Sequence, residues 1–320
     1  MSERAVVTTE TIGVLVMSYG TPESLSQVEQ YYTHIRRGRP PTKEQVDDLV
    51  RRYEAIVGGF FPLRRNTDNQ VQALQNTLEQ LYPSIPWRCY QGLKHALPYV
   101  EDGIKAMAAD GIRRAIGIVL APHYSTMSVG SYIKRAQMTA EEVGLQLNCI
   151  QSYHEHPKLI KAISERVQQA LTKFTDVDAD EVRVIFTAHS LPEKIKQVND
   201  PYPDQLLSTC RLIALQAGLH QWQFAWQSAG QTGEPWLGPD ILDELERISF
   251  DEGADHVLVC PIGFVSDHLE VLYDLDIEAQ SVARRLGMHL ERTAMLNTEP
   301  LYMETLAEEI FAGVHRLKEA

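Results

Sequence analysis

Short runs of apolar residues alternate with longer amphipathic stretches along almost the whole chain. The short runs predict β-strands, and the stretches with apolar residues three or four positions apart predict helices. Strands are expected at residues 12–18, 87–92, 115–121, 146–151, 182–188, 222–227, 256–260 and 288–292. The clearest helices are expected at residues 66–82, 95–109, 129–143, 157–173, 202–217 and 239–252. This alternation is typical of α/β proteins, in which helices cover both faces of parallel sheets.

An internal repeat indicates how the eight strands are divided. VLVMSYGTPE (14–23) and VIFTAHSLPE (184–193) are both apolar strands that end in a polar ring, followed by a small residue and then xPE. A looser pair is VLAPHYST (119–126) and VLVCPIGFVSD (257–267), in which a proline breaks the end of each strand. Eight strands could also form one (β/α)₈ barrel. The repeat favours two Rossmann-like lobes, each with a parallel four-stranded sheet flanked by helices.

The length of 320 residues suits two domains of about 150 residues each. We assign residues 1–152 to the first lobe and 153–299 to the second, and expect a helix over 300–320 to pack back on the first. Ligands of open parallel sheets bind beyond the carboxyl ends of the strands. The repeat places Tyr19, His123, His189 and the segment after Pro261 at such ends. We therefore expect these residues to face one cleft between the lobes.

The net charge of −13 argues against a nucleic-acid-binding protein, which would show a basic footprint. One segment, HIRRGRPP, nevertheless gathers Arg36, Arg37 and Arg39, and can attract an anionic small molecule. No apolar run approaches the ~20 residues of a membrane span, and no signal peptide is recognisable, so we expect a cytoplasmic protein. The four cysteines lie far apart without a CxxC pair. This spacing disfavours zinc ribbons and disulfide frameworks.

Several familiar motifs are missing. No GxGxxG follows the first strand and no GxxxxGK[ST] occurs, which disfavours nucleotide binding. No GxSxG elbow occurs, which disfavours a hydrolase triad.

One segment does suggest metal chemistry. DHLEVLYDLDIEAQ carries Glu270, Asp274 and Glu278 four residues apart, and no lysine or arginine interrupts it. On an α-helix these side chains would share a face. The row is either a solvated acidic surface or a series of oxygen ligands that leads a divalent cation inward. A lone histidine at a strand end is more often structural, but His189 lies at the binding edge, and an imidazole with a carboxylate suits Fe²⁺.

The chain resembles the ferrochelatases from about residue 12 to residue 300, most closely the coproporphyrin ferrochelatases of Gram-positive bacteria. The resemblance is carried by LVMSYGTPES, YYTHIRRGRPP, RYEAI, GLKHALPYVED, VLAPHYSTMSVGSY, TAHSLPEKI, DPYPDQL, WQSAGQTGEPWLGPD and CPIGFVSDHLEVLYDLDIEA. It implies two Rossmann-like domains around a porphyrin cleft, and an enzyme of haem biosynthesis that inserts Fe²⁺ into coproporphyrin III. Both Fe²⁺ and the porphyrin are substrates, and the next enzyme of the haem pathway is a further expected partner.

The resemblance also implies roles for single residues. His189 and Glu270 match the paired catalytic residues that handle the metal, and Tyr19 matches the residue that ligates product iron from the opposite side of the porphyrin. Residues that contact the porphyrin or its propionates are matched by Arg36, Arg52, Tyr53 and Tyr132. An outer metal site, for which Mg²⁺ is a candidate occupant, is matched by Asp274 and Glu278.

The chain departs from the family pattern at one place. Relatives carry a small polar residue before the PL of a GGxxPL segment, whereas this chain has Phe61 there, and Val57 looks like a one-residue insertion. A hydroxyl contact to a propionate is therefore expected to be lost. Family members with an iron–sulfur cluster have a cysteine-bearing C-terminal extension. This sequence has no cysteine after Cys260, so no cluster is expected.

Substrate choice stays open between two porphyrins. Arg36, Arg37, Arg39 and Arg52 favour coproporphyrin, which has four propionates, over protoporphyrin, which has two. Three rival functions are a cobalt or nickel chelatase for a sirohydrochlorin-type ring, a haem carrier that uses Tyr19, and a two-lobed binding protein for an anion. The sequence also leaves open which catalytic residue takes the pyrrole proton.

Overall fold

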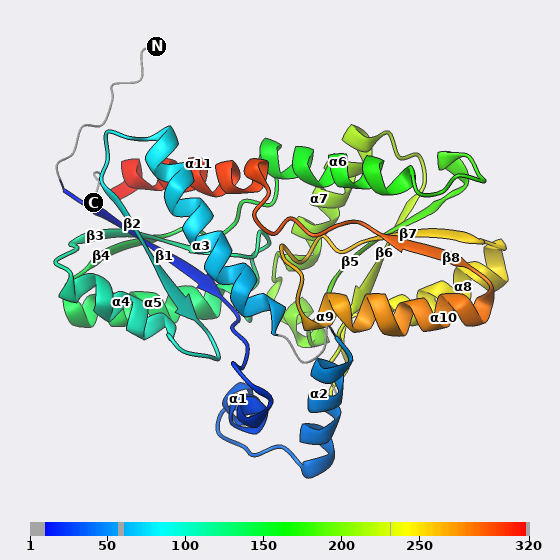
Figure 1. The fold of residues 1–320 in the computed structure, drawn as a ribbon, viewed down its shortest axis with the longest axis horizontal. Coiled ribbons are helices and arrows are strands. Elements are labelled where there is room, and N and C mark those ends of the chain that lie inside the picture. The colour runs from blue at the N-terminus through cyan, green and yellow to red at the C-terminus, as the bar shows by residue number, and fades with distance from the viewer. Residues whose placement is uncertain (1–9, 57–60, 231, 318–320) are drawn as a thin grey trace. The chain divides into compact units, whose positions relative to one another are not determined.

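The computed structural model describes residues 10–56, 61–230 and 232–317, and the chain divides into two compact units (Figure 1). The first unit runs to Tyr153, apart from a short stretch that begins at Ala55, and it resumes at Thr298. The second unit contains His154–Asn297. None of the described helices is long and apolar enough to cross a membrane.

The first unit is built on a parallel sheet with the strand order β2-β1-β3-β4. Its strands are β1 (Ile12–Ser18), β2 (Trp87–Leu93), β3 (Arg114–Val119) and β4 (Gln146–Cys149). All seven residues of β1 are buried, because helices cover both faces of the sheet. This is why the strand is an unbroken apolar run rather than an alternating one.

The helices of the first unit form two layers (Figure 1). One face of the sheet is covered by α3 (Pro62–Leu81) and α11 (Pro300–Leu317), and the other by α4 (Val100–Ala109) and α5 (Val129–Val143). The segment between β1 and α3 contains α1 (Val28–Ile35), α2 (Lys43–Ala55) and a 3₁₀ turn, Leu25–Gln27. The C-terminal helix α11 packs on α3, β3 and β4, far from it in the sequence.

The second unit repeats the plan with the strand order β6-β5-β7-β8, so that β5 takes the place of β1. Its strands are β5 (Arg183–His189), β6 (Trp222–Gln227), β7 (His256–Cys260) and β8 (His289–Arg292). Its helices are α6 (Pro157–Leu171), α7 (Tyr202–Ala217), α8 (Ile241–Glu252), α9 (Leu269–Leu272), a π-helix (Asp274–Ala279) and α10 (Gln280–Leu286), with 3₁₀ turns at Ala179–Glu181 and Glu193–Val198. The prediction of two parallel four-stranded sheets is confirmed.

Two expected helices differ from the observed ones. The helix expected from residue 95 begins at Val100, because Pro98 disfavours a helix there and the Asp102 carboxylate caps the amide of Tyr99 at 2.8 Å. The acidic segment is not one α-helix, because Asp274–Ala279 is a π-helix. The expectation of one regular α-helix through this segment is therefore wrong.

Candidate active site

The centre of the second unit's site is an imidazole–carboxylate pair. His189 is the last residue of β5 and Glu270 lies in α9, and Nε2 of the first is 3.6 Å from Oε1 of the second. Burial lowers the pKa of His189, but the adjacent Glu270 outweighs it and raises the pKa to about 9. Burial likewise opposes ionisation of Glu270, yet His189 holds its pKa well below the usual range. At neutral pH the pair therefore exists as imidazolium and carboxylate.

The backbone around His189 fixes the orientation of its ring. Nδ1 donates a hydrogen bond to the carbonyl of Ser190, which leaves Nε2 to face Glu270. The hydroxyl of Tyr202 donates to the His189 carbonyl at 3.1 Å. Gly263 passes so close that a Cβ there would lie 2.5 Å from the Cβ of Ala188. Only glycine fits this approach, which explains the PIG sequence after β7.

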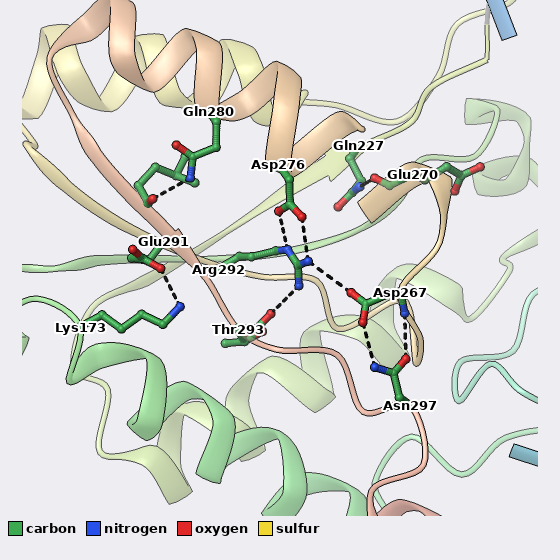
Figure 2. Close-up of polar contacts among 11 residues, drawn as sticks. Lys173, Gln227, Asp267, Glu270, Asp276, Gln280, Glu291, Arg292, Thr293 and Asn297 are labelled. Atoms are coloured by element: carbon green, nitrogen blue, oxygen red, sulfur yellow. Dashed lines mark hydrogen bonds and ion pairs between the residues drawn. The ribbon is translucent and has the colours of Figure 1, made fainter. Parts of the chain in front are cut away.

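Two buried hydrogen bonds connect the backbone of Glu270 to strand β5. The amide of Gln227 donates to the Glu270 carbonyl at 2.9 Å (Figure 2), and its oxygen accepts from the Thr187 hydroxyl at 2.7 Å. Both Gln227 and Thr187 are fully buried. Because Thr187 lies on β5 two residues before His189, the same strand supports both members of the pair.

A second imidazole, which the sequence analysis missed, lies at the other oxygen of Glu270. Nε2 of His268 is 3.6 Å from Oε2, and its Nδ1 donates to the Ser266 carbonyl at 2.9 Å. The only sequence signal was its place two residues before Glu270. The carboxylate thus lies between two imidazoles.

The outer acids, Asp274 and Glu278, both lie in the π-helix. Asp274 is buried and accepts a hydrogen bond from Ser228, while Glu278 is half-buried in the π-helix, where its amide bonds to the Tyr273 carbonyl five residues back at 3.0 Å. Among the described residues, no three His, Cys, Asp or Glu side chains are grouped to hold a metal ion.

In the first unit, Tyr19 directly follows β1, whereas its counterpart in the repeat, His189, is the last residue of β5. Its side chain is exposed, and its ring lies 4.7 Å from that of His95. Nδ1 of His95 is 2.9 Å from Nδ1 of His34, so one ring donates and the other accepts. Burial lowers the pKa of His95 to about 3, which keeps that ring neutral.

The two predicted porphyrin-binding arginines lie near helix ends. Arg36 follows α1, where its Nε donates to the Arg39 carbonyl at 3.3 Å and its guanidinium lies 5.7 Å from the Tyr32 ring. Arg52 lies in the last turn of α2 and pairs with Asp48 at 3.0 Å. A guanidinium carries five N–H donors in a planar fork, a geometry that suits a carboxylate.

The predicted tyrosine contacts are more enclosed. Tyr53 is buried; its hydroxyl is 3.1 Å from that of Thr21, and its ring packs on Phe61 at 4.6 Å. Phe61 thus occupies the first unit's interior, whereas the Val57 insertion and Phe60 lie outside the described residues.

Tyr132, on α5, is buried in the core of the first unit, with the Lys94 ammonium 4.8 Å from its ring centroid. Burial lowers the pKa of Lys94 to about 8. Neighbouring Arg135 pairs with Glu101 through two bonds of 2.7 Å, but no ion pair to Lys94 occurs among the described residues. The sequence analysis did not single out Lys94, although it lies in the GLKHALPYVED motif. A half-buried cation without a carboxylate partner is suited to bind an anion.

Comparisons with known proteins cover nearly the whole chain. The family model described as Ferrochelatase matches residues 11–313. A coproporphyrin III ferrochelatase of Geobacillus thermodenitrificans is 45% identical over 299 residues, 93% of this chain and 94% of that protein. One of Staphylococcus epidermidis is 43% identical over 303 residues, 94% and 98% of the two chains. The structure titled SirB from Bacillus subtilis with Fe³⁺ matches with a TM-score of 0.60 over 95% of this chain and 96% of that one; at 10% identity it shows a shared fold alone.

Proposed function

The chain belongs to the ferrochelatase family, and we propose that it inserts Fe²⁺ into coproporphyrin III to give iron-coproporphyrin in haem biosynthesis. The choice of porphyrin is supported by relatives that are named for this substrate. They are similar to this chain over more than nine-tenths of its length. The observation that carries the proposal is the pair of His189 and Glu270 at the carboxyl end of β5. An enzyme that binds and releases a divalent cation needs such groups in reach of one another.

The chemistry requires that Fe²⁺ lose its water and that two pyrrole N–H protons leave. In the free enzyme the pair of His189 and Glu270 holds one proton between a basic imidazole and an ionised carboxylate. A cation that approaches the pair repels the protonated imidazole and favours loss of its proton, so metal binding and proton release are coupled. Once His189 has released that proton to solvent, either its imidazole accepts a pyrrole proton while the carboxylate delivers iron, or the imidazole ligates iron and the carboxylate relays the pyrrole proton.

Tyr19 is proposed to lie on the opposite side of the porphyrin and to ligate iron after insertion. Its exposed side chain beyond β1 supports this role. Asp274 and Glu278 are proposed to form the outer metal site, which feeds Fe²⁺ inward and can accept Mg²⁺. Both residues are at least partly buried, and both follow Glu270 closely in the sequence. This supports a path for the metal ion, since partly desolvated carboxylates attract a cation more strongly than exposed ones.

The first unit is proposed to hold the porphyrin by its propionates. The residues assigned to this contact are Arg36, Arg52, Tyr53 and Tyr132. A flat porphyrin points its lone pairs within the ring plane, so an enzyme gains by using propionate binding energy to bend the ring. Lys94 is a further cation of this unit, and a ligand with four carboxylates can engage more such groups than one with two.

The setting of the reaction is also part of the proposal. We place the enzyme in the cytoplasm, and expect it to pass its product to the next enzyme of the haem pathway.

The test is an anaerobic insertion assay with Fe²⁺ and either coproporphyrin III or protoporphyrin IX. We expect kcat/KM to be higher for coproporphyrin III. Comparable efficiency with protoporphyrin IX would overturn the substrate assignment but not the chelatase activity. Turnover with Co²⁺ but not Fe²⁺ would overturn the choice of metal.

A further inference from the structure

The segment that carries the catalytic carboxylate contains more acids than the metal path uses. Residues 267–278 include no lysine or arginine and five carboxylates: Asp267, Glu270, Asp274, Asp276 and Glu278. Like charges at this density repel one another and would splay the segment. A compensating cation must therefore come from elsewhere in the chain.

The structure provides that cation at the end of the neighbouring edge strand. Arg292, the last residue of β8, binds both oxygens of Asp276 through bonds of 2.6 and 2.8 Å (Figure 2). Its Nη2 also bonds to Asp267 at 3.2 Å, and its Nη1 donates to the Thr293 carbonyl at 3.0 Å. The Arg292 side chain is only 17% exposed, so solvent screens these bonds less than it would on an open surface.

A second residue fastens the Asp267 end. The side-chain amide of Asn297 donates to Asp267 Oδ2 at 2.8 Å, and its oxygen accepts from the Asp267 backbone amide at 3.0 Å. Asn297 has a φ of 47°, and its own amide donates to the Val265 carbonyl at 2.8 Å. Asparagine tolerates this left-handed conformation better than most residues.

The other end is fastened at the π-helix. Asp276 lies within Asp274–Ala279, and Gln280, the first residue of α10, donates to the Leu290 carbonyl of β8 at 2.8 Å. A π-helix is rare and needs support from its surroundings, and such turns are frequent at functional sites. Strand β8 thus holds both ends of the segment in which His268 and Glu270 lie.

We propose that Arg292 is a positioning residue for metal insertion, clamping the segment 267–276 at Asp267 and Asp276 so that Glu270 is presented to His189. The clamp also divides the five acids by task. Arg292 pairs with Asp267 and Asp276, while Glu270, Asp274 and Glu278 are the carboxylates proposed to act on the metal cation. This inference rests on the proposed function of Glu270, but concerns residues that touch neither metal nor porphyrin.

The test compares Arg292→Gln with Arg285→Gln in the full-length protein. Arg285 is an exposed arginine of α10 in the same unit, paired with Glu246, and serves as the matched control. We expect Arg292→Gln to lower kcat/KM for Fe²⁺ by about 10- to 100-fold, because small displacements of a reacting group are this costly. The KM for the porphyrin should stay unchanged. Arg285→Gln should change neither quantity.

Hydrogen–deuterium exchange supplies a readout that needs no turnover. Arg292→Gln should speed amide exchange in residues 267–279 but not in β5, because only the clamped segment is released. If Arg292→Gln does not fold, Asp276→Asn, which removes one half of the clamp, is measured in the same two ways. Its losses should be smaller and in the same direction.

The proposal would be overturned if amide exchange in residues 267–279 stayed unchanged. It would also be overturned if Arg292→Gln lowered the thermal stability but kept kcat and the KM for Fe²⁺ within about twofold of the wild type. Failure of the proposed function is a separate result. A wild-type protein that inserts no iron would refute that function, whereas the exchange comparison would still decide whether Arg292 holds the segment.

Discussion

Replacing Glu270 by glutamine is expected to lower the pKa of His189 from about 9 toward the ordinary imidazole value of 6.5. The substitution keeps the volume of the side chain but removes its charge. The charge of Glu270 and its hydrogen bond are the largest contributions that raise the pKa of His189. Without them, the lowering of this pKa by burial is opposed only weakly. Asp274 and the Ser190 carbonyl also raise it, and both remain.

The size of the effect follows from the geometry of the pair. Each pKa unit corresponds to about 1.4 kcal/mol. Both side chains are 33% exposed, so solvent screens part of their attraction across 3.6 Å. We therefore expect the pKa of His189 to fall by about one to two units, or about 1.4–3 kcal/mol. The pair stabilises the folded wild type below pH 6.5, and this contribution is lost as the pH rises through about 9. In the variant this contribution should be smaller and should be lost at a lower pH.

The assay is a pH titration of ¹⁵N-labelled histidines by NMR, with a His189→Asn spectrum to assign the resonance. Two variants serve as controls. Asp274→Asn should lower the pKa of His189 less than Glu270→Gln does, because Asp274 is the smallest of the resolved causes. Glu278→Gln should leave it unchanged. A pKa of His189 near 6.5 in the wild type, or one that Glu270→Gln does not move, would refute the pairing.

Three further predictions concern the metal path, the porphyrin and the support of the site. Asp274→Asn and Glu278→Gln should lower kcat/KM for Fe²⁺ in a way that added Fe²⁺ largely restores; losses that ignore metal concentration would contradict a path. Arg36→Ala should weaken the preference for coproporphyrin III over protoporphyrin IX, which is measured as the ratio of the two kcat/KM values. The ratio should fall by about 10- to 100-fold, because a charged hydrogen bond of about 1.5–3 kcal/mol is lost. Thr187→Val should cost about 1–3 kcal/mol in urea unfolding, because it leaves the buried oxygen of Gln227 without its donor; a loss below about 0.5 kcal/mol would show that this bond does not support the site.

The fold could be predicted well from the sequence because apolar patterning governs it. Strands buried on both faces must be apolar runs, and the eight expected runs coincide with β1 to β8 to within two residues at each end. The repeat also paired the right strands, since β1 and β5 occupy equivalent positions in their sheets. Pro98 was present as a stop signal for the helix expected from residue 95, but the apolar pattern was given more weight.

The details of the site could not be predicted in the same way. A π-helix differs from an α-helix by one residue per turn, and no pattern of apolar residues in Asp274–Ala279 distinguishes the two. The contacts of His268 with Glu270, and of Arg292 with Asp267 and Asp276, depend on how segments far apart or irregular in conformation meet. Residue types suggested the chemistry, while the three-dimensional structure was needed to show which groups are partners.

The most direct test of the central claim is a single turnover with His189→Ala. Wild-type and variant proteins, each loaded with coproporphyrin III under anaerobic conditions, are mixed with Fe²⁺ and followed by the absorbance of the porphyrin. We predict that both bind the porphyrin, that the wild type converts it to iron-coproporphyrin, and that the variant does not. Conversion by His189→Ala at a near-normal rate under saturating Fe²⁺ would contradict the claim that the pair of His189 and Glu270 performs the insertion.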